Sequence, residues 1–566
     1  MYFSSEKRTT LLNLIRISAF VLILFVSITL LKNTTKTAHT PDLHIQNHLQ
    51  IAHATCQGTL YRDLCVSTLS SLPDLNSKSL PQLIAATVNQ TVYEIRASTR
   101  NCTRIETKSH LDILEHRALD DCLELLSYTM EDLKSILSEL SRRKAVSQNH
   151  HELQTIFSAA MTNQYTCLDG FAYSRGRVRD IIKRGIYNIS HHVSNSLVML
   201  NKIPGDNKTS PSEVFPGYGR VKNGFPKWLK QKDRKLLQAT LYETKFDLIV
   251  AQDGTGDFTT ISEAVAAAPN NSDTRSILGE RGSGEEDKES DVCRRRDRVD
   301  SSEGELLVCL YDAAGIKNSA VIFISMERCE LRKEAVVGNG FIAKGITIEN
   351  AAGPSKHQAV ALRCGSDLSA FYKCSFVGYQ DTLYVHSLRQ FYRECNVYGT
   401  VDFVFGNAAA VFQNCSLYAS KPNPNQKNIF TAQGREDRNQ NTGISILNSK
   451  LVAAADLIPE KSSFKTFLGR PWKEYSRTVI LQSYIDDSVD PAGWLEWNGT
   501  FALSTLYYGE YMNRGPGSNT SARVTWPGFR VINSSAEASQ FAVGPFIQGQ
   551  EWLHSTNIPY FLDLIS

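Results

Sequence analysis

The sequence predicts two folded parts, an antiparallel helical bundle over residues 50–200 and a parallel β-solenoid over residues 245–566. In the first part, apolar residues recur at three- and four-residue steps with few Gly or Pro, the pattern of helices that bury one face. In the second part, short β-rich runs recur about every 20 residues, which is typical of stacked coils. With 566 residues, 42% of them hydrophobic, the chain can form two or three folded domains.

The N-terminus has the pattern of a secretory signal. Lys7, Arg8 and Arg16 precede or open an apolar run over residues 17–31. A charged segment followed by a short apolar one is typical of a signal peptide, whereas a membrane-spanning helix needs about 20 apolar residues. We predict that residues 1–35 are a signal peptide or a signal anchor, which would hold the chain on the membrane before processing. Either one directs the chain into the secretory pathway.

Two further features agree with secretion. The chain has 12 cysteines, and disulfides persist in oxidising compartments. Sequons for N-glycosylation stand at Asn89, Asn101, Asn188, Asn207, Asn414 and Asn498. The net charge of +3 argues against a nucleic-acid partner and suits a polyanionic substrate.

The helical pattern is clear around residue 120. Leu111, Leu114, Ala118, Cys122 and Leu125 follow one another at helical spacing and share one predicted face. A helical bundle with short connections is the fold that buries such faces.

Residues 201–240 form a predicted linker rich in Pro, Gly, Lys and Asn. Near its end stands the basic pair Arg234 and Lys235. Because exposed linkers are preferred sites of proteolysis, we predict that a processing protease cleaves there.

The β-rich part contains four related phrases, ITIEN (346–350), FYKCSF (371–376), FYRECNVYG (391–399) and VFQNCSLY (411–418). Their spacing favours a parallel solenoid over an antiparallel sandwich, because sandwich hairpins would need tight Asn-Gly or Asp-Gly turns.

The repeat places polar residues one coil apart. Gln380 follows Gln358 by 22 residues, and Asp402 follows Asp381 by 21. Stacked strands lie about 4.8 Å apart, so these side chains should form a ladder on one face. Two neighbouring carboxyl groups cannot both ionise at low cost, so the pKa values of the two aspartates should differ. The glutamine amides can donate hydrogen bonds to an oxyanion. The ladder fits acyl-transfer catalysis; it also fits a structural role in the turns.

Four motifs carry a family resemblance: QAVALR (358–363), GYQDTLY (378–384), VDFVFG (401–406) and LGRPW (468–472). In this order, over residues 338–566, they resemble the plant pectin methylesterases. The resemblance implies a right-handed parallel β-helix that hydrolyses the C6 methyl esters of galacturonate in pectin, releases methanol and modifies the cell wall.

The resemblance also implies residue roles. Asp402 would be the nucleophile, Asp381 the general acid and base, and Gln380 a stabiliser of the transition state. Gln358 would assist in the substrate site, Arg470 would hold Asp402 ionised, and Trp472 would stack on a sugar. Cys395 and Cys415 would form a disulfide between coils. No metal or other cofactor is expected.

The helical part resembles the pectin methylesterase inhibitor domain, in the cysteines and in the phrases LDDCLELL (119–126) and MTNQYTCLDGF (161–171). The resemblance implies an all-α four-helix bundle with disulfides Cys56–Cys65 and Cys122–Cys167. Such a bundle would cover the catalytic site, within the chain or between chains, or assist export until the linker is cut.

Residues 276–334 depart from the family pattern. The run GERGSGEEDKESDVCRRRDR (279–298) has no apolar alternation and cannot supply strands with a buried face. We therefore predict a β-helix disrupted around residues 276–334. A real charged insertion and a reading frame shifted in the gene or by splicing are both consistent with this run.

Two alternative functions remain open at this stage. A pectin hydrolase or lyase would need further acidic residues or a calcium site, and we find neither motif. A secreted inhibitor or wall-binding protein would result if the disrupted segment had made the solenoid inactive.

Overall fold

The computed structural model describes residues 41–204 and 335–565, apart from residues 109–110, 143–144, 173, 175, 338, 346 and 557. Between these two ranges it describes residues 221–222, 225–226, 248–250, 257–258, 277–280, 307–309 and 321–322. The predicted signal, Asn207 and the pair Arg234 and Lys235 lie outside the described residues. Among those that are described, no helix combines the length and apolar character needed to cross a membrane.

The N-terminal part is a helical bundle, as predicted. Four long helices form a closed ring in which α4 contacts α5 and α8, and α7 contacts the same two helices. The helices are α2 (Pro41–Thr55), α3 (Arg62–Ser70), α4 (Leu80–Lys108), α5 (Ile113–Leu140), α6 (Ala145–Gln148), α7 (His150–Asp169) and α8 (Val178–Leu200).

Helix α5 shows how the sequence specifies the bundle. The Asp112 carboxylate accepts a hydrogen bond of 2.7 Å from the Glu115 N–H, which caps the start of the helix. Ala118, Cys122 and Leu125 are buried, as the periodicity predicts. Leu114 is the exception, because its side chain is 38% exposed.

Both disulfides predicted in the bundle are present. Cys56–Cys65 links the end of α2 to α3, and Cys122–Cys167 links α5 to α7. Cys102 is buried and unbonded. The Cys122–Cys167 bridge spans 45 residues and holds the two helices together near one end of α7.

The C-terminal part is a parallel β-helix built from three sheets. The first sheet contains β6 (Val321–Ile322), β7 (Ala335–Val337), β10 (Leu362–Cys364), β13 (Leu383–Val385), β16 (Val404–Gly406), β19 (Asn428–Gln433) and β22 (Thr466–Gly469). The second contains β3 (Leu248–Val250), β4 (Ile277–Glu280), β5 (Leu307–Cys309), β8 (Ile342–Lys344), β11 (Ser369–Tyr372), β14 (Arg389–Arg393), β17 (Ala409–Gln413), β20 (Gly443–Leu447), β23 (Arg477–Leu481), β25 (Tyr507–Tyr511) and β26 (Phe529–Val531). The third contains β9 (Thr347–Glu349), β12 (Ser375–Val377), β15 (Asn396–Gly399), β18 (Ser416–Ala419), β21 (Lys450–Ala453) and β24 (Tyr484–Ile485).

Some short elements lie outside these sheets. Strands β1 (Val221–Lys222) and β2 (Phe225–Pro226) form an antiparallel pair in the linker. The C-terminal helices α11 (Ser535–Ser539), α12 (Val543–Ile547) and α13 (Gly549–Trp552) pack through apolar side chains against the second sheet.

Successive coils stack in register through their apolar interior. Phe371, Tyr392 and Phe412 occupy equivalent positions on β11, β14 and β17. Their rings stack almost parallel, with centroids 4.8 and 4.5 Å apart. Each coil thus repeats the burial pattern of the one before it, and the 20-residue periodicity has this structural origin.

The predicted disulfide between Cys395 and Cys415 is absent, because both residues have free thiols. They belong to a ladder of equivalent positions inside the β-helix. At each step, the side chain of one coil accepts a hydrogen bond from the backbone N–H of the equivalent residue in the coil before it. The Cys395 N–H donates to the Cys415 sulfur at 3.4 Å, and the Cys415 N–H donates to the Ser449 hydroxyl at 3.0 Å. The thiols also contact backbone carbonyl oxygens of Phe371 and Tyr392. Since these contacts satisfy the sulfur atoms, they act as small buried core groups.

The parallel order changes at the N-terminal edge of the β-helix. Strand β5 pairs antiparallel with β4 and β8, and β6 pairs antiparallel with β7. From β8 onward, the strands of the β-helix pair in parallel. The antiparallel pairs fall within or beside residues 276–334, most of which lie outside the described residues.

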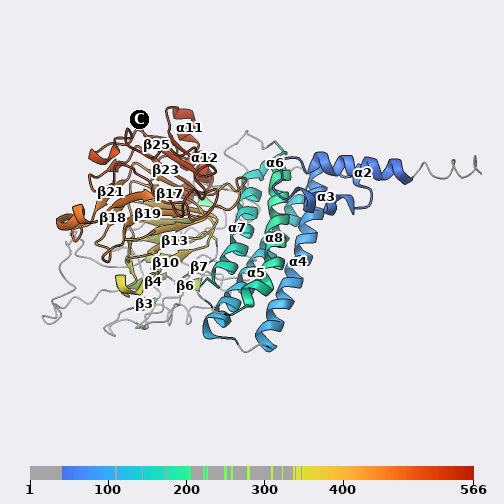
Figure 1. Cartoon of the computed structure of the whole chain (residues 1–566), viewed down its shortest axis with the longest axis horizontal. Helices are drawn as coiled ribbons and strands as arrows, with labels where there is room; N and C mark the ends of the chain where they lie inside the picture. Colours follow the sequence, from blue (N-terminus) through green and yellow to red (C-terminus); the bar gives the residue numbers. More distant parts are fainter. Residues whose placement is uncertain are drawn as a thin grey trace, which may run out of the picture.

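The bundle stands beside the β-helix, and α7 lies on the side of the bundle that faces it (Figure 1). Helix α4 lies on the opposite side of the bundle in this view. Helix α7 is therefore the long helix that lies next to the β-helix.

We predict that the free thiols at Cys395 and Cys415 will be found in the purified protein. The protein is unfolded under non-reducing conditions in the presence of iodoacetamide, which alkylates free thiols. Peptide mapping by mass spectrometry should then detect Cys56–Cys65 and Cys122–Cys167 as linked peptides. Cys395 and Cys415 should be recovered alkylated. A linked peptide joining these two residues would contradict the ladder described above.

Candidate active site

The two predicted catalytic aspartates occupy equivalent positions in successive coils. Leu383 pairs with Val404 in the first sheet, and each aspartate stands two residues before its partner in this pair. Both Asp381 and Asp402 have left-handed backbone conformations, with φ of 64° and 53°. Non-glycine residues adopt this region at a cost, and such strain often occurs at functional sites.

The predicted glutamine ladder is also present. Gln358 and Gln380 form a parallel bridge between neighbouring coils, and the Ala359 N–H donates to the Gln380 carbonyl at 3.0 Å. Both glutamines are half-buried, as is Asp381. The spacing of 22 and 21 residues thus correctly predicted that these residues occupy equivalent positions in neighbouring coils.

Arg470 holds Asp402 by two hydrogen bonds. Its Nε donates to Oδ1 at 2.8 Å and its Nη2 donates to Oδ2 at 2.6 Å, so the guanidinium binds the carboxylate in a bidentate manner. Asp402 is buried, and burial raises its pKa, while the charge and hydrogen bonds of Arg470 oppose the rise. The pair brings together residues that are 68 positions apart in the sequence.

An aromatic wall lies beside this pair. The rings of Tyr384 and Phe405 stack with centroids 4.4 Å apart, and the half-buried Trp472 meets both of them edge-on at 6.3 and 5.9 Å. A Cβ at Gly434 would stand 2.7 Å from the Trp472 ring, so this glycine allows the ring to lie close to the backbone. Tyr384 and Phe405 are buried, and Trp472 is the partly exposed ring of the three.

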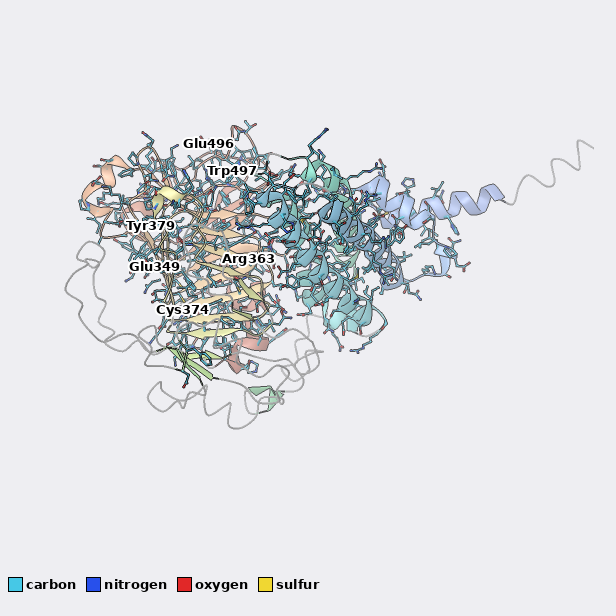
Figure 2. All side chains as sticks on the ribbon, turned by 90° about the horizontal axis from the view of Figure 1, so that it is seen from below. Glu349, Arg363, Cys374, Tyr379, Glu496 and Trp497 are labelled. Atoms are coloured by element: carbon cyan, nitrogen blue, oxygen red, sulfur yellow. A yellow bond between two sulfur atoms is a disulfide. The ribbon has the colours of Figure 1, made fainter. Side chains whose placement is uncertain are left out.

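Two further tryptophans, Trp494 and Trp497, differ in burial. Trp494 is fully buried and its indole N–H donates to Glu510 at 3.1 Å, so it belongs to the core. Trp497 is 38% exposed, and the Arg470 guanidinium lies 4.4 Å from its ring centroid. Trp497, labelled in Figure 2, therefore belongs to the site.

Helix α7 contacts the residues that follow the first-sheet strands. These contacts involve one polar face of the helix, which is formed by Glu152, Thr155, Ser158, Thr162, Thr166 and Asp169. The Asn407 amide donates to the Thr162 hydroxyl at 2.9 Å, and Thr166 lies 2.8 Å from the ring nitrogen of His386. The Gln440 amide donates to the Ser158 carbonyl at 3.0 Å.

Ion pairs stand at both ends of this face. Near the start of α7, Glu152 pairs with the buried Arg389, which also pairs with Asp367 at 2.6 Å. At the end of α7, Asp169 lies 2.9 Å from the amine of Lys473. The bundle is thus joined to the β-helix by polar groups and buried charges.

Sequence reasoning did not select His386, Asn407 or Lys473. Lys473 directly follows the LGRPW motif, so its position was a usable signal. His386 and Asn407 each follow a first-sheet strand by one residue, and only the three-dimensional structure shows that α7 reaches them.

The predicted glycosylation sites differ in exposure. Asn89, Asn414 and Asn498 are exposed, whereas Asn101 and Asn188 are half-buried on α4 and α8. The three exposed positions are the ones most open to a glycan.

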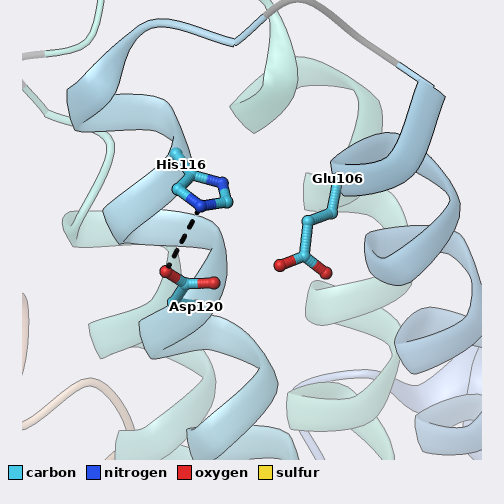
Figure 3. A group of neighbouring side chains, drawn as sticks. All are labelled: Glu106, His116 and Asp120. Carbon is cyan, nitrogen blue, oxygen red and sulfur yellow. Dashed lines mark ion pairs between the residues drawn. The ribbon is translucent and has the colours of Figure 1, made fainter.

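One group of side chains in the described residues has the spacing of metal ligands. Glu106 on α4 faces His116 and Asp120 on α5, with ligand atoms within 4.8 Å of one another (Figure 3). His116 and Asp120 form an exposed ion pair at 3.9 Å. The group lies in the bundle, between α4 and α5.

Comparison with known proteins agrees with both parts. The profile of the family described as Pectinesterase matches residues 247–550. The chain belongs to the pectinesterase family. The profile described as Plant invertase/pectin methylesterase inhibitor matches residues 50–199.

Named relatives match over most of the chain. Probable pectinesterase/pectinesterase inhibitor 39 of Arabidopsis thaliana is 47% identical over 499 residues, which are 86% of this chain and 90% of that protein. Pectinesterase 1 of Citrus sinensis is 43% identical over 528 residues, 91% and 89% of the two chains. The solved structure of pectin methylesterase from carrot is 46% identical in sequence to this chain. The match covers 58% of this chain and 99% of the carrot chain, with a TM-score of 0.48. This pectinesterase is a carboxylic ester hydrolase that de-esterifies pectin.

We predict that Arg470→Met destabilises this pectinesterase in a pH-dependent way. The variant leaves Asp402 buried without its cation, which costs about 3 kcal/mol when the carboxylate is ionised. Because burial raises the folded-state pKa of Asp402, the loss should be small at low pH and grow as the pH rises through that pKa. Urea unfolding at pH 5 and pH 8 measures the difference. The control is the double variant Asp402→Asn with Arg470→Met, whose loss of unfolding free energy should be the same at both pH values. If the single variant Arg470→Met also lost the same unfolding free energy at pH 5 and at pH 8, the prediction would be contradicted.

Proposed function

We propose that this pectinesterase cleaves the C6 methyl esters of galacturonate with Asp402 as nucleophile and Asp381 as general acid and base. The observation that carries the proposal is the bidentate Arg470–Asp402 pair with a second carboxyl one coil away. A nucleophilic carboxylate must be ionised in a buried site, and the arginine supplies the opposing charge.

The reaction proceeds in two steps. A carboxylate oxygen of Asp402 attacks the ester carbonyl carbon, and the amides of Gln358 and Gln380 donate to the oxyanion. The tetrahedral intermediate collapses as the protonated Asp381 gives its proton to the departing methoxide, so methanol leaves and an acyl-enzyme remains. Asp381, now ionised, takes a proton from water, and the hydroxide attacks the acyl-enzyme. Collapse of the second intermediate releases galacturonic acid and restores the Asp402 carboxylate and the protonated Asp381. The released acid then loses its proton to water and becomes the galacturonate carboxylate.

The aromatic wall would position the polysaccharide. Trp472 supports one sugar ring by stacking, and Trp497, whose ring centroid lies 4.4 Å from the Arg470 guanidinium, extends the surface. No step requires a metal ion, since the carboxylates and amides supply the nucleophile, the acid and the oxyanion donors.

The bundle is proposed to restrain this activity within the same chain. Helix α7 contacts the carboxyl ends of the first-sheet strands and reaches Tyr384 of the aromatic wall through Thr166. A polysaccharide lying across Trp472 would meet this helix. Cleavage near Arg234 and Lys235 by a protease would then allow the bundle to leave.

The expected location follows from the same features. We infer that the chain is exported through the secretory pathway and acts in the cell wall. The two disulfides and the exposed sequons at Asn89, Asn414 and Asn498 support this inference.

One observation favours a second candidate function. The antiparallel pairs of β4, β5 and β6 interrupt the parallel order on one edge of the β-helix. If the early coils cannot support the site, the chain would act as a secreted inhibitor or wall-binding protein. It would then release no methanol in any form and would still inhibit a second, active pectinesterase.

We predict that Asp402→Asn lowers methanol release from methylated pectin by about a thousandfold or more, because the amide cannot act as the nucleophile. The matched control is Asp487→Asn, which changes an exposed carboxylate paired with Lys461 and should retain native activity. Substantial activity in Asp402→Asn would overturn the assignment of the nucleophile.

We predict that Ser158→Arg raises methanol release by the full-length chain at least tenfold. Ser158 is buried where α7 contacts Gln440 and Asn441, so an arginine there should separate the bundle from the β-helix. Ser127→Arg is the control, because Ser127 is exposed on α5. Equal activity of the two variants, with both chains folded, would argue against restraint by the bundle.

A further inference from the structure

Lys473 occupies a position shared by the two domains. Its amine lies 2.9 Å from an Asp169 oxygen at the end of α7 and 3.0 Å from an oxygen of Glu436, which belongs to the β-helix part. The same amine lies 5.1 Å from the ring centroid of Trp472. Its side chain is only 18% exposed, so these contacts are largely shielded from water.

The charges around Lys473 are unequal. One lysine faces two carboxylates, and burial, with the charge of Asp169 adding to it, raises the pKa of Glu436 to about 7 although Lys473 opposes the shift. Burial alone would lower the pKa of Lys473, but Glu436 and Asp169 raise it above its usual value. An ammonium group has three donors, so Glu436 leaves it able to bind a second carboxylate. In the assembled chain the bundle supplies that carboxylate.

The substrate offers the same chemical group. Each hydrolysed ester leaves a free carboxylate on the polymer, so pectin that has been partly processed carries carboxylates beside the remaining esters. A sugar stacked on Trp472 would place a neighbouring unit close to Lys473, because the lysine is the next residue and its amine lies against the same ring.

Helix α7 approaches along the same surface. Thr166, one turn before Asp169, contacts His386 and the Tyr384 hydroxyl, and the Tyr384 ring meets Trp472. The end of the helix thus extends from the aromatic wall to the lysine, as a bound polysaccharide would.

We propose that Lys473 binds the free carboxylate of a galacturonate unit next to the ester under attack, and that Asp169 imitates this carboxylate when the bundle is docked. The proposal rests on the proposed function and specifies its substrate preference. It gives the enzyme a preference for esters that lie beside an already processed unit. It also makes free carboxylates on the polymer competitors of the bundle.

The first experiment compares two galacturonate oligomers of equal length, one fully methylated and one half-methylated, in the full-length Ser158→Arg background. Methanol release gives KM and kcat for each. We expect a lower KM for the half-methylated oligomer. Adding Lys473→Gln should raise that KM about tenfold, with a smaller effect on the fully methylated oligomer, and Lys473→Arg should restore the preference.

The control variant for charge is Lys421→Gln, which removes an exposed lysine paired with Glu460 and should keep the preference. A Lys473→Gln variant that slows both oligomers by one common factor, or neither, would overturn the proposal while leaving the esterase function intact. Absence of methanol release from every variant would overturn the function itself and this proposal with it.

The second experiment tests whether Asp169 occupies the place of the substrate carboxylate at Lys473. It is done without the Ser158→Arg substitution. In the otherwise native full-length chain, Asp169→Asn should increase the affinity for an unmethylated oligogalacturonate at least fivefold by calorimetry. Glu152→Gln removes the other charged contact of α7, with Arg389, and should give no comparable gain. An equal gain in the two variants would show general loosening of the bundle and would overturn the role of Asp169.

Discussion

The register between successive coils of the β-helix is the constraint on which the rest of the structure depends. Parallel pairing repeats each position about one strand spacing further along the axis. The stacked rings of Phe371, Tyr392 and Phe412 maintain this register in the interior, and left-handed residues at the bends allow each coil to turn at the same point. Because of this repetition, Asp381 and Asp402 lie in adjacent coils at equivalent positions, and the two glutamines do the same.

The active site adds long-range contacts to this regular frame. Arg470 follows β22, two coils beyond β16, yet its Nε and Nη2 both donate to the carboxylate of the buried Asp402. The strained backbone and the buried charge would destabilise an isolated segment. The stacked coils supply the rigidity that holds them, while the antiparallel pairs remain at the N-terminal edge, outside the strands β10 to β22 that form the site.

The bundle contacts one end of the first-sheet strands, and the two aspartates lie at the other end. The aspartates precede β13 and β16, whereas α7 contacts His386 and Asn407, which follow these strands. The aromatic wall lies between the two. We therefore propose that the docked bundle restrains the binding of the polysaccharide and leaves the aspartates themselves unchanged.

The sequence by itself determined the periodic features of this protein. Helical spacing predicted the bundle, and the 21- and 22-residue intervals predicted the ladder of aspartates and glutamines, because regular folds convert spacing directly into position. The two disulfides Cys56–Cys65 and Cys122–Cys167 were correctly expected from family resemblance, whereas the Cys395–Cys415 bridge was wrong, since stacked thiols can instead hydrogen-bond along the coils. Only the tertiary structure decided which of Trp494 and Trp497 is buried, and which residues of the β-helix meet α7. These features depend on contacts between segments hundreds of residues apart, and no local pattern encodes such contacts.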